Sequence, residues 1–236
     1  MRLSEFVTAL KNTARRSDRT GSPGGRSDKA AEYLRSIRES SAENDTEQKT
    51  RQASAEMWRI SIERFADKEI ITRGGKPLKN AVFERSLERV SQWAHGRRRP
   101  WLMLTGTLGT GKSTLARAAA AAVSGMEGLG GYVQMRATAT NWMKPEDIAT
   151  YTRAAVLVID DLGCEQADVK LYGNTVSPMA EIICERYDRM RTTIFTTNEL
   201  ASDIKKIYGD RIADRMREMC EVVKMEGESF RKGGAK

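Results

Sequence analysis

The chain has 236 residues, with 40 basic and 32 acidic side chains and a formal net charge of +8. This length allows one α/β domain and a smaller additional part, and excludes two large domains. One histidine and three widely spaced cysteines exclude a zinc site built on paired cysteines, and no apolar run approaches the about 20 residues that span a bilayer. We expect reduced thiols, a cytoplasmic location and, from the positive charge, an anionic partner such as nucleic acid.

Residues 1–70 form a first region, in which short helical patterns alternate with polar stretches. Helices are expected at 3–10 and 30–38, and the glycine- and serine-rich segment between them is typical of a flexible linker. A third helix is predicted over 53–67. Its apolar residues are Met57, Ile60, Ile62 and Phe65. This helical, partly flexible region would be either a docking element for a partner protein or an arm that packs on the rest of the chain.

Residues 71–236 have the regular pattern of a single domain. A helix is predicted just before the first strand, with Val82, Leu87, Val90 and Trp93 on one face. The arginines at 97–99 that follow could contact a phosphate backbone or form a solvated loop.

The segment WLMLTGTLGTGKST combines a short apolar strand, a glycine-rich loop and the start of an alanine-rich helix. Such glycines let successive backbone N–H groups point into one concavity, at the positive end of the helix dipole. The segment therefore predicts a nucleotide polyphosphate site, with Lys112 on the β and γ phosphates and the Ser113 hydroxyl on Mg²⁺. The predicted binding residues are Gly106, Thr107, Leu108, Gly109, Thr110, Gly111, Lys112, Ser113 and Thr114.

A second motif follows a strand predicted at 130–135 and a helix predicted at 145–153. The apolar run 154–159 is typical of a strand buried on both faces, and it ends in Asp160 and Asp161. Asp160 would hold the magnesium ion through its water shell, and Asp161 would orient or polarise the water that attacks the γ phosphate.

A third buried strand, TTIFTTN, ends in Asn198, whose amide could hydrogen-bond the attacking water. Between the second and third motifs, Lys170 and Tyr172 offer a cation and an aromatic ring for single-stranded DNA, although Tyr172 could equally pack in the core.

From Lys79 to Arg231 the chain resembles the AAA+ ATPases of the DnaC and DnaI helicase-loader group, with the IstB transposition helpers close behind. The segments that carry this resemblance are GTLGTGKST, VLVIDDLG, YGNTVSPMAEIICERYDRMRTTIFTTN, YGDRIADRMREM and GESFR. The resemblance implies an α/β P-loop NTPase with a five-stranded parallel sheet flanked by helices, a reduced or absent helical lid, and ATP bound where subunits meet. It also implies that Arg215 reaches a neighbour's ATP as an arginine finger, with Arg211 as a second candidate, and that Arg231 senses ATP within its own subunit.

The motifs predict a Mg²⁺-dependent ATP site, and the resemblance implies an oligomeric ATPase that loads or remodels a replicative helicase on single-stranded DNA. Because Asp161 stands where many AAA+ enzymes have glutamate, we expect slow hydrolysis or action mainly as an ATP-dependent binder. Three alternatives stay open: an IstB-like ATPase that assists a transposase, a P-loop small-molecule kinase, and a DNA-binding adaptor that holds ATP without turnover.

Overall fold

The computed structural model describes residues 54–77, 79–166, 169–171, 174–199 and 201–230. All of them belong to one compact unit, residues 52–236. The helices expected at 3–10 and 30–38, and the linker between them, lie outside the described residues.

The core of this unit is a five-stranded sheet in which every strand pair is parallel. The strand order is β2-β3-β6-β1-β7, so β6 lies between the strand that leads into the glycine-rich loop and the strand that ends in the aspartates. This confirms the predicted five-stranded parallel sheet. The strands are β1 (Trp101–Thr105), β2 (Val133–Arg136), β3 (Val156–Asp160), β6 (Thr192–Thr197) and β7 (Cys220–Lys224).

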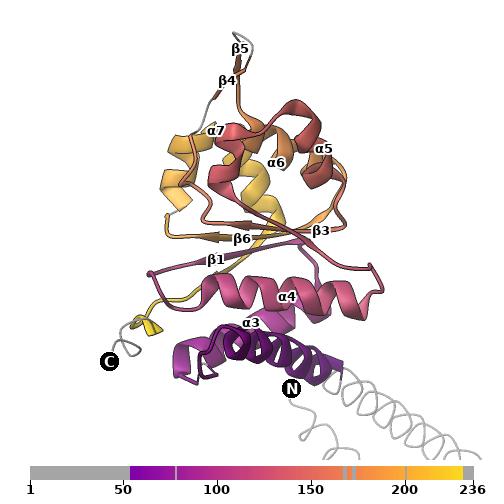
Figure 1. The fold of residues 1–236 in the computed structure, drawn as a ribbon, viewed down its shortest axis with the longest axis vertical. Coiled ribbons are helices and arrows are strands. Elements are labelled where there is room, and N and C mark those ends of the chain that lie inside the picture. The colour runs from indigo at the N-terminus through magenta and orange to yellow at the C-terminus, as the bar shows by residue number, and fades with distance from the viewer. Residues whose placement is uncertain (1–53, 78, 167–168, 172–173, 200, 231–236) are drawn as a thin grey trace, which may run out of the picture. The chain divides into compact units, whose positions relative to one another are not determined.

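Helices cover both faces of the sheet (Figure 1). Helices α3, α4 and the helix over residues 54–72 lie on one face, and α5, α6 and α7 lie on the other. The bounds are α3 (Ala81–Gly96), α4 (Lys112–Met126), the 3-10 helix η1 (Ala137–Trp142), α5 (Pro145–Arg153), α6 (Pro178–Asp188) and α7 (Ala201–Met219). Helix α5 has the bounds predicted from the sequence.

Alternate residues of each central strand enter opposite halves of the core. In β1, Leu102 and Leu104 pack with α3 and α4, whereas Trp101 and Met103 pack with α6 and α7. Because side chains point alternately to the two faces of a strand, a strand covered by helices on both sides must be apolar throughout. This explains the unbroken apolar runs that mark β1 and β3 in the sequence.

The predicted apolar face of the 54–72 helix is wrong except at Ile62. Met57 and Ile60 are exposed, at 62% and 55%, and Phe65 is partly exposed. The buried residues, Trp58, Ile62 and Ala66, pack with α3 and α4. They follow the i, i+4, i+8 spacing of one helix face.

Two further features follow from the backbone. Helix α7 is kinked at Gly209, which has φ 77° and ψ 175°. The loop predicted to carry Lys170 contains an antiparallel hairpin of β4 (Val169–Leu171) and β5 (Asn174–Val176), which points away from the sheet (Figure 1). Within the described ranges, no helix is both long and apolar enough to cross a membrane.

Candidate nucleotide-binding site

The glycine-rich loop connects β1 directly to α4. Helix α4 begins at Lys112, and its N-cap is Gly111, a left-handed residue with φ 90°. The Nζ of Lys112 donates to the carbonyl oxygens of Gly106 and Thr107 at 2.8 and 2.7 Å. The lysine head therefore lies inside the loop, where it can meet phosphate oxygens together with the N–H groups of the first turn of α4. Strand, glycine-rich loop and helix follow one another as the sequence motif predicts.

The segment after β7 lies against the same loop. The backbone N–H of Phe230 donates to the carbonyl oxygen of Gly109 at 3.0 Å, and the Thr107 hydroxyl donates to the carbonyl oxygen of Gly227 at 2.9 Å. A Cβ on Gly109 would clash with the side chain of Ser229. Close packing of the chain therefore favours glycine here, as does the left-handed φ of 79°. Sequence reasoning missed this packing role.

The aspartates stand at the carboxyl end of β3, and Thr196 of β6 holds both of them. The Thr196 hydroxyl donates to Oδ1 of Asp160 at 2.6 Å and accepts from the backbone N–H of Asp161 at 2.9 Å. The register pairs Ile159 with Phe195, which places Thr196 beside Asp160. Thr196 was not predicted as a site residue, although its place one strand over from Asp160 follows from the parallel order of the sheet.

The other oxygen of Asp160 faces α4. Nη1 of Arg117 lies 3.5 Å from Oδ2 of Asp160, so the second turn of α4 lies next to the aspartate. Ser113 is four residues earlier and therefore on the same face of α4, toward the phosphate loop. A hydroxyl and a carboxylate are the hard oxygen donors that Mg²⁺ prefers. The residues at this position fit a magnesium ion held by Ser113 and Asp160.

Asn198 directly follows β6, at the edge of the sheet where β3 delivers its aspartates, and it is exposed.

The turn after Asp161 is fixed by Glu165, whose Oε2 accepts from the backbone N–H of Gly163 at 2.9 Å. The hydroxyl of Tyr208 in α7 donates to the other carboxylate oxygen of Glu165. Burial raises the pKa of Glu165. This link from α7 to the turn was not predicted.

The two candidate arginine fingers on α7 differ in their surroundings. The guanidinium of Arg215 stacks over the Tyr187 ring, 4.5 Å from its centroid, and its Nη2 lies 3.4 Å from Oδ1 of Asp188. Its buried Nη1 has no hydrogen-bond partner among the described residues. Arg211 is exposed. Arg231, predicted to sense ATP, lies outside the described residues, directly after Phe230.

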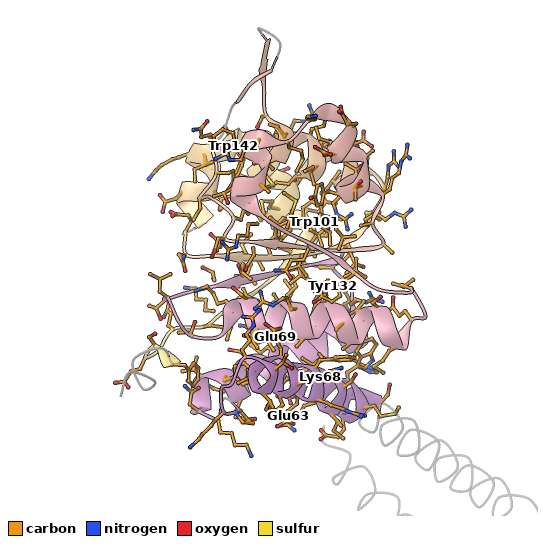
Figure 2. All side chains as sticks on the ribbon, in the orientation of Figure 1. Glu63, Lys68, Glu69, Trp101, Tyr132 and Trp142 are labelled. Atoms are coloured by element: carbon orange, nitrogen blue, oxygen red, sulfur yellow. The ribbon has the colours of Figure 1, made fainter. Side chains whose placement is uncertain are left out.

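The residues predicted to contact DNA are only partly visible. Lys170 lies on β4, its side chain is not described, and Tyr172 lies outside the described residues. Trp142, at the end of η1, is 86% exposed. Figure 2 places it at the end of the unit opposite Glu63 and Lys68. Sequence reasoning gave Trp142 no role, although it follows β2 in a short polar stretch where an aromatic side chain has little to pack against.

The phosphate loop, the aspartates one strand beyond β6, and the strand order together define a P-loop ATPase fold of the AAA+ type. The family model described as "IstB-like ATP binding protein" matches residues 78–235. The chain belongs to this family, and the domain is an ATP-binding domain.

Solved structures agree with this fold. The "DnaC helicase loader" is 24% identical with a TM-score of 0.50, and the alignment covers 62% of this chain and 92% of that one. "DnaI" is 16% identical with a TM-score of 0.50, covering 63% and 87%. Among curated proteins, none matches the chain significantly.

Proposed function

We propose that the protein is a Mg²⁺-dependent ATPase that assembles on single-stranded DNA and loads or remodels a replicative helicase. The observation that carries the ATP site is the joint position of three elements: the phosphate loop around Lys112, the buried carboxylate of Asp160, and strand β6, which Asn198 directly follows. Membership of an ATP-binding family supports the nucleotide.

Each site residue has a distinct role in this proposal. Lys112 neutralises the β and γ phosphates, and Asp160, held by Thr196, carries the carboxylate that binds the ion with Ser113. The ion, when bound, stabilises negative charge on the phosphate oxygens. Asp161 orients the attacking water and Asn198 hydrogen-bonds it. The Asp161 carboxylate is one methylene shorter than glutamate, so we expect slow hydrolysis.

Arginines complete the site. Arg231 directly follows Phe230 in the sequence, and the Phe230 N–H donates to the phosphate loop, which supports the proposal that Arg231 senses ATP in the same subunit. Arg215 of a neighbouring subunit, or Arg211 in its place, supplies the finger. A guanidinium is permanently charged and binds two phosphate oxygens at once, which suits charge that develops on a γ phosphate. Self-association then becomes a condition for turnover.

The partner is proposed to dock on the N-terminal region, residues 1–70. The structural neighbour named as a helicase loader favours a replicative helicase, whereas the IstB-like family model favours a transposase as the alternative. Nothing in the comparisons favours a small-molecule kinase. A pull-down of helicase and transposase with the full chain decides between the two partners. We expect Lys112→Ala to retain partner binding and to lose ATP-dependent release.

Single-stranded DNA is proposed to contact the end of the unit that carries the β4–β5 hairpin. Lys170 lies on this hairpin, and the exposed Trp142 offers a ring for base stacking. The net charge of +8 favours a polyanion.

The deciding experiment measures ATP hydrolysis with and without single-stranded DNA over a range of protein concentrations, for the wild type and for Lys112→Ala. We expect turnover per subunit to rise with concentration and with DNA, and to vanish in Lys112→Ala. ATP binding without turnover under every condition would support the adaptor alternative. Turnover that depends on neither DNA nor protein concentration would instead indicate a small molecule as the phosphate acceptor.

A further inference from the structure

A buried arginine connects the 54–72 helix to the proposed magnesium site. Arg117 of α4 is 8% exposed. Its Nε donates to Oε1 of Glu69 at 2.7 Å, its Nη2 lies 2.5 Å from the same oxygen, and its Nη1 lies 3.5 Å from Oδ2 of Asp160. Figure 2 shows Glu69 on the side of its helix that faces α4. One guanidinium therefore bridges two carboxylates from segments far apart in the chain.

The bridge bears on the charge of Asp160. With Thr196 on Oδ1 and Arg117 on Oδ2, both oxygens of the carboxylate are oriented. A cation beside this carboxylate also opposes the binding of a second cation there, because like charges repel more strongly in a partly buried site than in water. Glu69 offsets that repulsion by pairing with the same guanidinium. Glu69 also lies 3.0 Å from Arg73 of its own helix end.

We propose that Arg117 and Glu69 are positioning residues that set the Mg²⁺ affinity of Asp160, and thereby link the 54–72 helix to the ATP site. This inference rests on the proposed function. Residues 54–70 of this helix belong to the region proposed to dock a partner. A shift of the helix that takes Glu69 away from Arg117 leaves the guanidinium uncompensated beside Asp160 and raises the Mg²⁺ concentration that ATP binding requires.

The test uses substitutions with opposite expected effects. Glu69→Gln removes the charge that compensates Arg117, so the half-saturating Mg²⁺ concentration rises. The expected rise is roughly threefold to tenfold for a unit charge separated from the Asp160 carboxylate by one guanidinium. Arg117→Met removes the opposing cation, so the same concentration falls by a comparable factor, while Glu69 keeps Arg73 as its partner. Arg117→Lys keeps the positive charge and remains close to the wild type.

The measurement is the binding of a fluorescent ATP analogue to the full chain as MgCl₂ is titrated. Thermal unfolding in EDTA, as a second readout, measures the stability of each variant without bound Mg²⁺. Glu63→Gln is the matched control, because Glu63 lies on the same helix and pairs with Arg59. Shifts of the same sign in Glu69→Gln and Arg117→Met, or shifts no larger than that of Glu63→Gln, would overturn the inference. A wild type that binds no nucleotide at any Mg²⁺ concentration would overturn the proposed function itself, which separates the two failures.

Discussion

Replacing Thr196 with valine tests how the aspartates are held. Thr196 is fully buried, and its hydroxyl makes both the bond to Asp160 and the bond from the backbone N–H of Asp161. Valine has nearly the same shape but can make neither. A hydrogen bond to a charged group contributes about 1.5–3 kcal/mol, and a buried donor left unpaired costs about 1–3 kcal/mol. We expect the free energy of unfolding to fall by about 2–4 kcal/mol, a large share of an ordinary domain's stability.

Urea unfolding, followed through the fluorescence of the tryptophans, of which Trp58, Trp93 and Trp101 are buried, measures this loss. Thr196→Ser is the control, because it restores the hydroxyl and removes only one buried methyl group, at about 1 kcal/mol. The expected order of stability is wild type, then serine, then valine. If valine is as stable as serine, the hydroxyl does not hold the two aspartates, and the account of this edge of the sheet is wrong.

Two other predictions concern packing and thiol chemistry. Gly109→Ala should lower the melting temperature more than Gly128→Ala. Both glycines have a positive φ, 79° and 65°, which costs about 1–2 kcal/mol for a residue with a side chain, but of the two only a Cβ at 109 would meet another atom, the Ser229 Oγ. Equal losses of melting temperature would exclude this close contact. Burial raises the pKa of the Cys220 thiol, so this thiol stays protonated at about pH 8.5 and should react with a thiol reagent only when the protein unfolds. The exposed Cys164 should react in the native protein. Rapid labelling of Cys220 in the native Cys164→Ser variant would contradict this prediction.

Most of the fold could be predicted because its signals are local. The glycine-rich loop, the buried strand that ends in Asp160, and the acidic start of α5 each lie within one short stretch of sequence, and the structure has them where they were expected. The apolar face of the 54–72 helix could not be predicted in the same way. Which side of that helix is buried depends on the shape of α3 and α4, and the larger apolar side chains of the helix, Met57 and Ile60, are exposed.

The missed residues of the site share a different property: each acts across elements that are distant in sequence. Thr196 matters because β6 is inserted beside β3, and Arg117 matters because Glu69 comes to meet it from 48 residues upstream. The only sequence sign of Arg117 is a single arginine in an alanine-rich helix whose other charged residue is Lys112 of the phosphate loop. A charged side chain on the buried face of such a helix needs an ion-pair partner. A lone arginine among alanines is therefore a reasonable candidate for a buried ion pair on sequence grounds.

The choice between Arg215 and Arg211 as the finger gives the last prediction. Arg215 is held against its own subunit by the Tyr187 ring and Asp188, so Arg215→Ala should lose some stability, about 1 kcal/mol for a partly desolvated cation–π contact, as well as turnover. Arg211 is exposed, so Arg211→Ala should leave stability unchanged. Adding either variant to wild-type subunits separates the roles, because a finger acting in trans lowers the activity of its neighbours. We expect Arg215→Ala to lower wild-type turnover below simple dilution. If Arg211→Ala does so and Arg215→Ala does not, then Arg211 is the finger and Arg215 only ties α7 to α6.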